Sequence, residues 1–278
     1  MKTIYHFSGA GNDFVVIDGR KGDVSAFREV PRIEALCKEF KTDGLMILGQ
    51  EMPGQAGHDV MADPDRPSVD FTMEFYNPDG SGGMMCGNGG RCIVAFADYL
   101  GIKPADGEVF LFRAPDGLHT GEILERPEEG LWTVRIKMID VQGITPLLGG
   151  FFLNTGTRHF VKFVDDVEKV DIDAEGKALR WDEAFAPVGT NVNFVHIAPD
   201  GLHVRTFEKG VEGETLACGT GLTACALVAH HTGVPTATPG AYRLRARQDW
   251  LSVNFTPGAD EKFTDVYLTG PARLVEIL

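Results

Sequence analysis

Hydrophobic and polar residues alternate along many short stretches of the chain, and this pattern predicts strands. In residues 69–75 every second side chain is hydrophobic, as expected for a strand with one buried face. Pro115-Asp116-Gly117 and Pro199-Asp200-Gly201 are typical of turns that join two strands into a hairpin. Further strands are predicted at residues 3–7, 14–18, 45–48, 109–114, 118–124, 132–138, 151–155, 160–164, 192–198 and 202–207, and several short strands are predicted to complete the chain.

Two hydrophobic segments have a helical period instead. Apolar residues recur at helical spacing between residues 93 and 100, where Gly101 ends the pattern, and again from Gly219 to about His230. A helix that is apolar around much of its surface is expected at the centre of its domain, wrapped by strands. A third helix is predicted to begin at Pro31 and to end near Phe40.

The order of these signals indicates an ancient duplication. Each half of the chain has strands, then a glycine-rich turn, then one apolar helix, then more strands. Residues 126–130 are the expected boundary between the halves. Residues 51–68 are rich in Pro, Gly and Asp without any apolar period, which predicts a surface loop. We therefore expect an α/β (α+β) fold with two domains.

Composition narrows the class of protein. A length of 278 residues favours two domains, and a net charge of −14 disfavours nucleic-acid and anionic-membrane partners. Residues 1–14 predict a strand and a polar turn rather than a secretion signal, and no run of about 18 apolar residues is present to predict a membrane span. Five cysteines is an odd number, so we expect reduced thiols and a cytoplasmic location rather than a disulfide framework.

Two of these cysteines begin the two apolar helices. Cys86-Gly87-Asn88-Gly89 and Cys218-Gly219-Thr220-Gly221 share the pattern Cys-Gly-polar-Gly. The N-terminus of a helix favours a thiolate, and its backbone N–H groups bind anions such as carboxylates. Two such half-sites facing one another would hold one carboxylate between two sulfurs. This arrangement suits removal of a proton from one face of a carbon and return of a proton to the other face.

The other cysteines and two further polar residues have less specific signals. Cys37, Cys92 and Cys225 fall at apolar helical positions and are expected in the core. His159 follows a turn and Glu208 ends a strand. Each is either an ordinary residue of its segment or a hydrogen-bond partner that sets the pKa of a thiol. The eight histidines show no metal-binding spacing. No metal site is therefore expected.

The two cysteine motifs resemble those of the diaminopimelate epimerase family. Asn77-x-Asp79-Gly80-Ser81 precedes the first motif, and Gly210-x-x-Gly213-Glu214-Thr215 precedes the second, as in that family. Three further motifs match in the same order, and the similarity runs from about residue 1 to the C-terminus: Gly9-x-Gly11-Asn12-Asp13-Phe14, Asp43-Gly44-Leu45 and Thr190-Asn191-Val192-Asn193-Phe194.

The resemblance implies a cofactor-free isomerase that interconverts LL- and meso-diaminopimelate, on the route to lysine and peptidoglycan. It implies two pseudo-symmetric domains, each a strongly curved and mostly antiparallel sheet around a central helix. Residues 1–128 would carry Cys86 and be completed by a C-terminal strand at about 267–278, and residues 129–266 would carry Cys218. A homodimer is possible, and the partner is a small molecule.

The resemblance also implies roles for individual residues. Cys86 and Cys218 would be the acid/base thiols, tuned by His159 and Glu208. Backbone N–H groups of Gly87, Asn88, Gly219 and Thr220 would bind the reacting carboxylate. The remaining substrate contacts would come from Asn12, Asn77, Thr157, Asn191, Glu208 and Lys209.

Three positions depart from the family pattern. Gly156-Thr157-Arg158-His159 stands where the family has Gly-Asn-Pro-His, so Thr157 replaces an asparagine ligand. Glu208-Lys209 replaces Glu-Arg, and a lysine lacks the bidentate grip that an arginine has on a carboxylate. The segment before Asp43 is short. All three departures concern recognition of the distal end of the substrate.

Three alternatives remain at this stage. A proline or hydroxyproline epimerase would share the two thiols, but the Cys86-Gly87-Asn88-Gly89 form and the Asn12 and Asn191 motifs stand against it. An isomerase related to phenazine biosynthesis would share the fold but lack the cysteine pair. A non-catalytic amino-acid-binding protein would need neither thiol.

Overall fold

The structure, a computed structural model, describes residues 2–50, 68–83 and 85–278. It divides into two compact units, Met1–Ile136 with Ala272–Leu278, and Lys137–Pro271. The loop expected at residues 51–68 lies outside the described residues except for Ser68. Among the described helices, none is long and apolar enough to cross a membrane.

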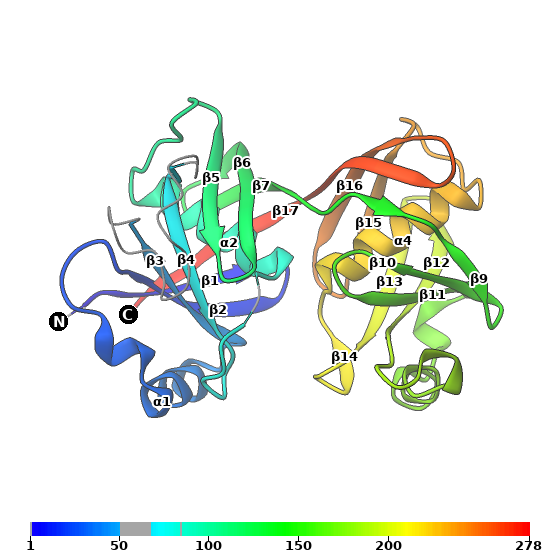
Figure 1. Cartoon of the computed structure of the whole chain (residues 1–278), viewed down its shortest axis with the longest axis horizontal. Coiled ribbons are helices and arrows are strands. Elements are labelled where there is room, and N and C mark those ends of the chain that lie inside the picture. Colours follow the sequence, from blue (N-terminus) through cyan, green and yellow to red (C-terminus); the bar gives the residue numbers. More distant parts are fainter. Residues whose placement is uncertain (1, 51–67, 84) are drawn as a thin grey trace, which may run out of the picture. The chain divides into compact units, whose positions relative to one another are not determined.

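The first unit is a mixed, mostly antiparallel sheet with two α-helices and one short 3-10 helix (Figure 1). Its strands are β1 (Ile4–Gly9), β2 (Asn12–Asp18), β3 (Gly44–Gly49), β4 (Phe71–Tyr76), β5 (Val109–Ala114), β6 (Gly117–Glu128) and β7 (Leu131–Lys137), together with the end of β17 (Lys262–Ile277). β2 pairs with β3 in parallel and β4 with β5 in parallel, while β1–β2, β3–β4, β5–β6, β6–β7 and β1–β17 are antiparallel. The helices are η1 (Ser25–Arg28), α1 (Val30–Phe40) and α2 (Gly87–Tyr99).

The second unit repeats this plan. Its strands are β8 (Val141–Gln142), β9 (Thr145–Leu147), β10 (Gly150–Asn154), β11 (Arg158–Phe163), β12 (Asn191–Ala198), β13 (Gly201–Glu208), β14 (Gly213–Thr215), β15 (Ala241–Arg245), β16 (Trp250–Pro257) and the first part of β17. β11–β12 and β13–β15 are parallel, and β10–β11, β12–β13, β15–β16 and β16–β17 are antiparallel. Its helices are η2 (Val167–Lys169), η3 (Ile172–Gly176), α3 (Lys177–Arg180), η4 (Glu183–Phe185) and α4 (Gly219–His231).

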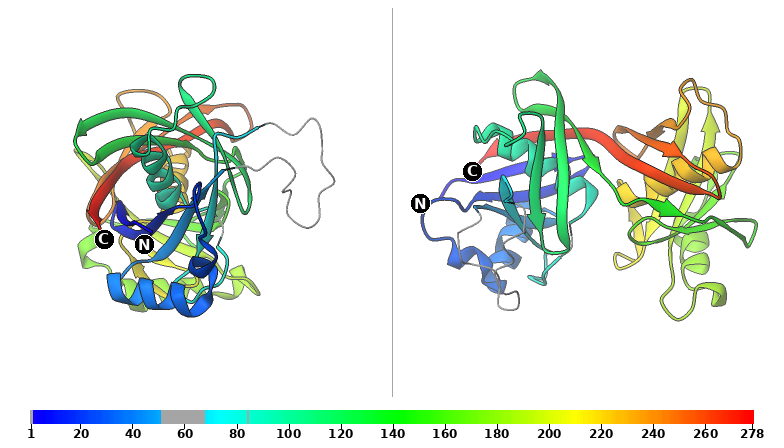
Figure 2. Two further views of the ribbon diagram at one scale, coloured as in Figure 1. Left: turned by 90° about the vertical axis from the view of Figure 1, so that its left-hand side faces the viewer. Right: turned by 45° about the horizontal axis from the view of Figure 1, so that its top comes forward.

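One buried helix lies at the centre of each unit, as the hydrophobic pattern predicts. Strands surround α2 in the end-on view of Figure 2, and α2 contacts β1, β2, β3 and β6. In the second unit α4 contacts the corresponding strands β10, β11, β12 and β16, and also β13 and β15. The α+β class and the internal repeat are therefore confirmed at the level of topology.

Several details differ from the sequence expectations. Residues 126–130, expected as a boundary, lie at the turn from β6 into β7, because β6 continues to Glu128. The chain ends in one 16-residue strand, β17, rather than in short strands alone. The chain from residue 167 to 185 forms η2, η3, α3 and η4, for which the alternation pattern had given no signal.

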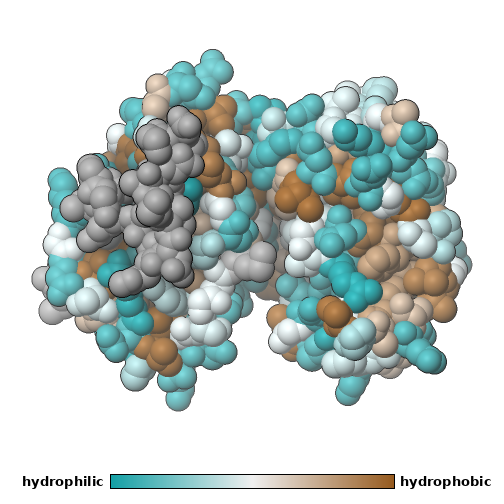
Figure 3. Space-filling view, in the orientation of Figure 1, coloured by the Kyte–Doolittle hydropathy of each residue, from teal (hydrophilic) through white to brown (hydrophobic). Residues whose placement is uncertain are grey.

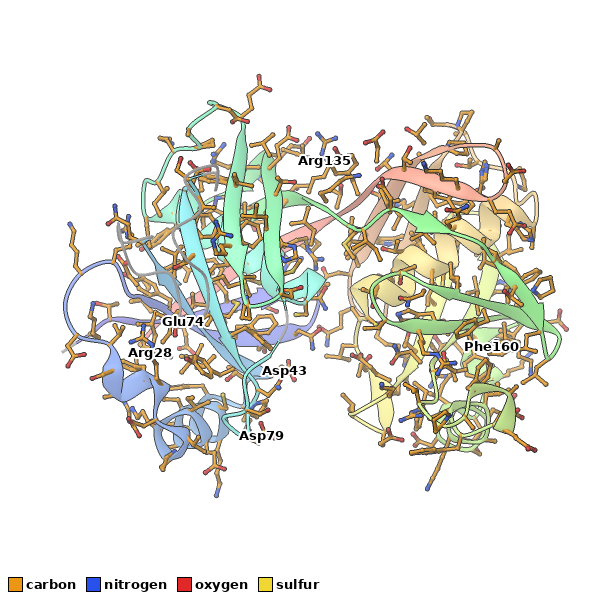
Figure 4. The ribbon with its side chains drawn as sticks, viewed as in Figure 1. Arg28, Asp43, Glu74, Asp79, Arg135 and Phe160 are labelled. Atoms are coloured by element: carbon orange, nitrogen blue, oxygen red, sulfur yellow. The ribbon has the colours of Figure 1, made fainter. Side chains whose placement is uncertain are left out.

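Hydrophobic side chains fill the space beside each sheet. Ile33, Leu36 and Cys37 of α1 pack in one cluster with residues of β2 and β3. In the second unit, η4 adds Phe185 to a cluster that includes Phe160 of β11, labelled in Figure 4. On the face shown in Figure 3, hydrophobic residues are interspersed with hydrophilic ones. Each unit thus has a core of its own.

Candidate active site

Cys86 is the N-cap residue of α2. Its backbone is extended (φ −102°, ψ 149°), and its sulfur accepts a hydrogen bond from the Gly89 N–H at 3.2 Å. The first helical hydrogen bond runs from the Gly90 N–H to the Cys86 carbonyl at 2.7 Å. The N–H groups of Gly87 and Asn88 therefore belong to the open N-terminal turn, where an anion is favoured. The side chain of Cys86 is half-buried.

A chain of hydrogen bonds ties this turn to the β1–β2 hairpin. Asn88 donates through Nδ2 to Oδ1 of Asn12, and Asn12 donates to Asp43 at 3.2 Å. The buried Arg91 donates to Oδ1 of Asn88 at 2.9 Å and to the Gly87 carbonyl at 3.2 Å. The structure thus brings together the predicted residues Asn12, Gly87 and Asn88 beside Cys86, with both asparagine side chains engaged in protein contacts.

Asn77 lies in a separate turn before the first cysteine. Its side chain donates to Ser81 Oγ at 2.9 Å, and Asp79 accepts hydrogen bonds from both the N–H and the hydroxyl of Ser81. Asp79 and the neighbouring Pro78 are exposed. This turn explains the Asn-x-Asp-Gly-Ser pattern as a local structure that holds Asn77 in place.

Cys218 occupies the matching position at the start of α4. Its backbone is extended (φ −114°, ψ 108°), and its carbonyl accepts the first helical hydrogen bond, from the Leu222 N–H at 2.9 Å. Its side chain is buried, at 8% exposure, and its sulfur lies 3.5 Å from the Thr220 hydroxyl. The open turn here consists of Gly219 and Thr220, the residues expected to present N–H groups to a carboxylate.

His159 lies beneath this second cysteine turn. Its Nε2 is 2.9 Å from the hydroxyls of both Thr157 and Thr220, while the Thr155 hydroxyl donates to the Thr220 carbonyl at 2.9 Å. The imidazole is fully buried, and burial lowers its pKa from 6.5 to about 3. His159 therefore contacts Cys218 indirectly, through Thr220, and is neutral at physiological pH.

Asn191 organises the loop ends beside His159. Its side chain donates to the Thr157 hydroxyl at 3.3 Å and to the Arg158 carbonyl at 3.0 Å, and its Oδ1 accepts the Lys209 N–H at 2.8 Å. Lys209 itself is exposed. The Arg158 guanidinium is directed elsewhere, to the Phe185 carbonyl at 3.1 Å. Asn191, Thr157 and Lys209 are thus brought together as a group.

Glu208 lies at the end of β13, next to Lys209. Its carboxylate accepts a hydrogen bond from the Thr215 hydroxyl at 2.9 Å, which links β13 to β14. Glu208 is partly buried, whereas Lys209 is exposed. The second unit therefore holds a carboxylate and an ammonium group at adjacent positions of one strand end.

The remaining cysteines are core residues, as predicted. Cys92 and Cys225 are fully buried, and Cys37 is 3% exposed. Burial raises the pKa of all three thiols. These groups are therefore protonated and inert at neutral pH.

Two polar residues near the thiols had no role assigned from the sequence. Arg91 and Asn193 are both fully buried and both hydrogen-bonded to residues of the cysteine turns or their neighbours. A polar side chain at every second position in Asn191-Val192-Asn193-Phe194 was the available signal, because a strand places residues 191 and 193 on one face. For Arg91, the available signal was a charged residue within an otherwise apolar helix.

Sequence comparison connects these half-sites to a known family. The family profile described as "Diaminopimelate epimerase" matches residues 4–123 and 151–275. The chain is 37% identical over 277 residues to the diaminopimelate epimerase of Chlorobaculum tepidum, covering 96% of this chain and 97% of the relative. It is also 37% identical over 289 residues to that of Aquifex aeolicus, covering 96% and 93%.

Solved structures share the fold at lower identity. A phenazine biosynthesis protein of Bacillus anthracis superposes with a TM-score of 0.72 at 11% identity, covering 100% of this chain and 98% of that one. A hydroxyproline epimerase of Agrobacterium vitis gives a TM-score of 0.64 at 14% identity, covering 100% and 91%. These two likenesses concern the fold alone, whereas the sequence matches extend over both cysteine motifs. The chain belongs to the diaminopimelate epimerase family.

Proposed function

We propose that this protein epimerises LL-2,6-diaminopimelate to meso-diaminopimelate without a cofactor, using Cys86 and Cys218 as acid and base. The observation that carries the proposal is the matched placement of the two thiols. Each is the N-cap residue of the buried helix of its unit, in extended backbone conformation. The other three cysteines lie within helices α1, α2 and α4 rather than at their N-termini.

The chemistry divides between the two thiols. One cysteine, as the thiolate, removes the α-proton, and the electron pair of the broken C–H bond passes into the substrate carboxylate. The other cysteine, as the thiol, delivers its proton to the opposite face of the same carbon and becomes the thiolate. In the reverse direction the roles exchange. The charge that develops on the carboxylate is stabilised by backbone N–H groups of Gly87, Asn88, Gly219 and Thr220.

The remaining groups supply specificity for the substrate. Asn12, Asn77, Asn191 and Thr157 are each held by hydrogen bonds that leave further donor or acceptor capacity. Glu208 suits the reacting ammonium group, and the exposed Lys209 suits the distal carboxylate. The substrate has two carboxylates and two ammonium groups, and the site offers both a carboxylate and an ammonium group to bind them.

A direct assay tests this proposal. LL-diaminopimelate, L-proline and trans-4-hydroxy-L-proline are incubated separately with the purified protein in D₂O. We expect epimerisation of LL-diaminopimelate only, with solvent deuterium at the α-carbon of each product molecule. Retention of the original hydrogen would contradict separate donor and acceptor thiols. Turnover of either proline substrate in its place would contradict the proposed specificity.

A further inference from the structure

A row of buried polar side chains crosses three strands beneath α4. Thr206 of β13 lies directly opposite Asn193 of β12, and β12 runs parallel to β11, which carries His159 (Figure 1). Thr206 is 3% exposed, and Asn193 and His159 are fully buried. Burial of three polar groups is costly unless they are hydrogen-bonded, so their mutual contacts are constrained.

The side-chain amide of Asn193 has only one orientation that satisfies its neighbours. Its Nδ2 lies 3.1 Å from the Phe160 carbonyl, which can only accept, so Nδ2 must be on that side. Its Oδ1 then accepts from the Thr206 hydroxyl at 3.0 Å. A flipped amide would place two oxygens against one another at Phe160.

The orientation of Asn193 determines the tautomer of His159. The same Nδ2 lies 3.1 Å from Nδ1 of the imidazole, and because Nδ2 donates, Nδ1 must carry the lone pair. The ring proton is then on Nε2, 2.9 Å from the Thr220 hydroxyl oxygen. Nε2 lies equally close, 2.9 Å, to the Thr157 hydroxyl. Because Nε2 carries the proton, it cannot accept the Thr220 hydroxyl hydrogen, and the acceptors left for that hydrogen are the Thr157 hydroxyl at 3.3 Å and the Cys218 sulfur at 3.5 Å. A thiolate is charged and is therefore the stronger acceptor of the two.

We propose that Asn193 is a positioning residue that fixes His159 as the neutral, Nε2-protonated tautomer, so that the Thr220 hydroxyl donates to the thiolate of Cys218. This inference rests on the proposed function, because it assigns a task to the thiol that the reaction uses. The lowered pKa of the buried His159 agrees with a neutral ring. His159 then polarises Thr220 and takes no proton from Cys218.

The first unit offers an internal contrast. Gly221 and Gly89 are both the third residue after their cysteine. A Cβ at Gly221 would lie 2.4 Å from Asn193 Oδ1, whereas a Cβ at Gly89 would lie 3.3 Å from the sulfur of Met46. Polar groups thus lie beneath the Cys218 turn and a thioether lies beneath the Cys86 turn. The side chains that pack beneath the two turns therefore differ in polarity.

The first test determines the tautomer of His159 in the unaltered protein. Nitrogen NMR of ¹⁵N-histidine-labelled protein, with His159 assigned by its loss in His159→Gln, distinguishes a protonated ring nitrogen from one with a lone pair. We expect Nε2 protonated and Nδ1 unprotonated throughout the neutral range. A protonated Nδ1, or a ring that titrates near the ordinary histidine pKa of about 6.5, would overturn the inference.

The second test measures the pH at which Cys218 becomes a thiolate. Its alkylation by iodoacetamide is followed against pH by mass spectrometry of its peptide, because only the thiolate reacts. Thr220→Val removes the donor. We expect the pH midpoint of Cys218 alkylation to rise by about one unit, since a hydrogen bond to an ion is among the stronger ones. Thr220→Ser should keep the wild-type midpoint.

Thr223→Val is the matched control, because Thr223 is a buried threonine of the same helix whose hydroxyl donates to the Gly219 carbonyl at 3.0 Å. It should also keep the wild-type midpoint. An unshifted Thr220→Val, or an equal shift in the control, would overturn the role of the Thr220 hydroxyl.

Asn193→Asp tests the positioning residue itself. A carboxylate accepts from Nδ1–H, so the ring proton moves to Nδ1 and the Nε2 lone pair takes the Thr220 hydroxyl hydrogen away from Cys218. We expect the NMR signals of His159 to exchange and the alkylation midpoint of Cys218 to rise. Wild-type signals and midpoint in a folded Asn193→Asp protein would overturn the inference. If this variant fails to fold, the NMR measurement of the His159 tautomer in the unaltered protein tests the inference instead.

None of these measurements needs substrate. Absence of epimerase activity would therefore refute the proposed function while the tautomer and thiolate measurements stand by themselves. Conversely, an active epimerase whose His159 has a protonated Nδ1 would refute this inference alone.

Discussion

The Gly89 N–H donates to the sulfur of Cys86 at 3.2 Å, so a thiol takes the N-cap place that serine or aspartate usually has. Cys218 begins its helix in the same extended conformation, and its sulfur meets the Thr220 hydroxyl. The Cys86 sulfur thus has a backbone amide as a neighbour, and the Cys218 sulfur has a side-chain hydroxyl. The repeated fold places both sulfurs at the same position of their helices.

Replacing either of these thiols should abolish epimerisation. Cys86→Ala and Cys218→Ala each remove one proton-transfer group, and we expect kcat to fall by on the order of 10²–10⁴-fold or more. Cys225→Ala and Cys37→Ala should retain most of the activity because both thiols are buried and protonated. Steady-state epimerisation assays measure all four variants. Substantial turnover by either of the first two would refute the assignment.

The glycines that follow the two cysteines should differ in their tolerance of alanine. A Cβ at Gly221 would lie 2.4 Å from Asn193 Oδ1, inside the fixed polar row. We expect Gly221→Ala to lower the free energy of unfolding by roughly 1–3 kcal/mol and to eliminate activity. A Cβ at Gly89 would lie 3.2 Å from the Cys86 sulfur and 3.3 Å from that of Met46, a flexible side chain.

Gly89→Ala should therefore destabilise the protein less than Gly221→Ala. Urea unfolding of the two variants under one set of conditions measures the difference. Equal destabilisation would show that the polar row beneath α4 is as adaptable as the methionine beneath α2.

Arg91 should contribute strongly to stability although it lies within an apolar helix. Its buried guanidinium donates to the Gly87 carbonyl and to Asn88 Oδ1. Arg91→Met should cost on the order of 3 kcal/mol, because two charge-assisted hydrogen bonds are lost in a buried place. Arg28→Met is the control, since its side chain is 43% exposed and its ion pair with Glu74 lies at the surface (Figure 4). That variant should cost less than about 1 kcal/mol.

The buried neutral His159 predicts a specific dependence of stability on pH. Its pKa is about 3 in the folded protein and about 6.5 when unfolded, so between these values the unfolded chain binds one more proton. This residue therefore lowers the free energy of unfolding as the pH falls from about 6.5 towards 3, with a limiting slope of roughly 1.4 kcal/mol per pH unit. His159→Gln should be less stable at neutral pH but should show a shallower slope in that window. An unchanged slope in chemical denaturation would contradict a neutral His159.

Lys209 should contribute to binding of the substrate rather than to the chemical step. Its backbone is fixed by Asn191 and its side chain is exposed, whereas Arg158 donates to a backbone carbonyl. Lys209→Met should raise KM by roughly tenfold or more with a smaller change in kcat, because one charge-assisted contact contributes about 1.5–3 kcal/mol. Lys209→Arg should keep or improve KM.

Lys169→Met, at a lysine whose side chain is 84% exposed, is the control and should leave KM unchanged. An unaltered KM in Lys209→Met would mean that another basic residue binds the distal carboxylate.

Much of this molecule follows from the sequence alone. Alternation predicts the β4 strand, and hydrophobicity on all sides predicts the burial of α2 and α4. Both predictions are possible because the repeat of a strand or helix determines which of its residues share a face. The two Cys-Gly-x-Gly turns are also local, so they place Cys86 and Cys218 at helix N-termini without knowledge of the rest of the chain.

Only the tertiary structure decided which groups support those thiols. His159, Asn193 and Thr220 come from β11, β12 and α4, and Arg91 reaches Asn12 through Asn88 across the turn into the β1–β2 hairpin. No local pattern encodes these contacts, because hydrogen-bond partners far apart in sequence meet only when the strands adopt their register. The protonation state of His159 is likewise not encoded by any local pattern. Burial by the whole unit sets its pKa, and the carbonyl of Phe160 sets the orientation of Asn193.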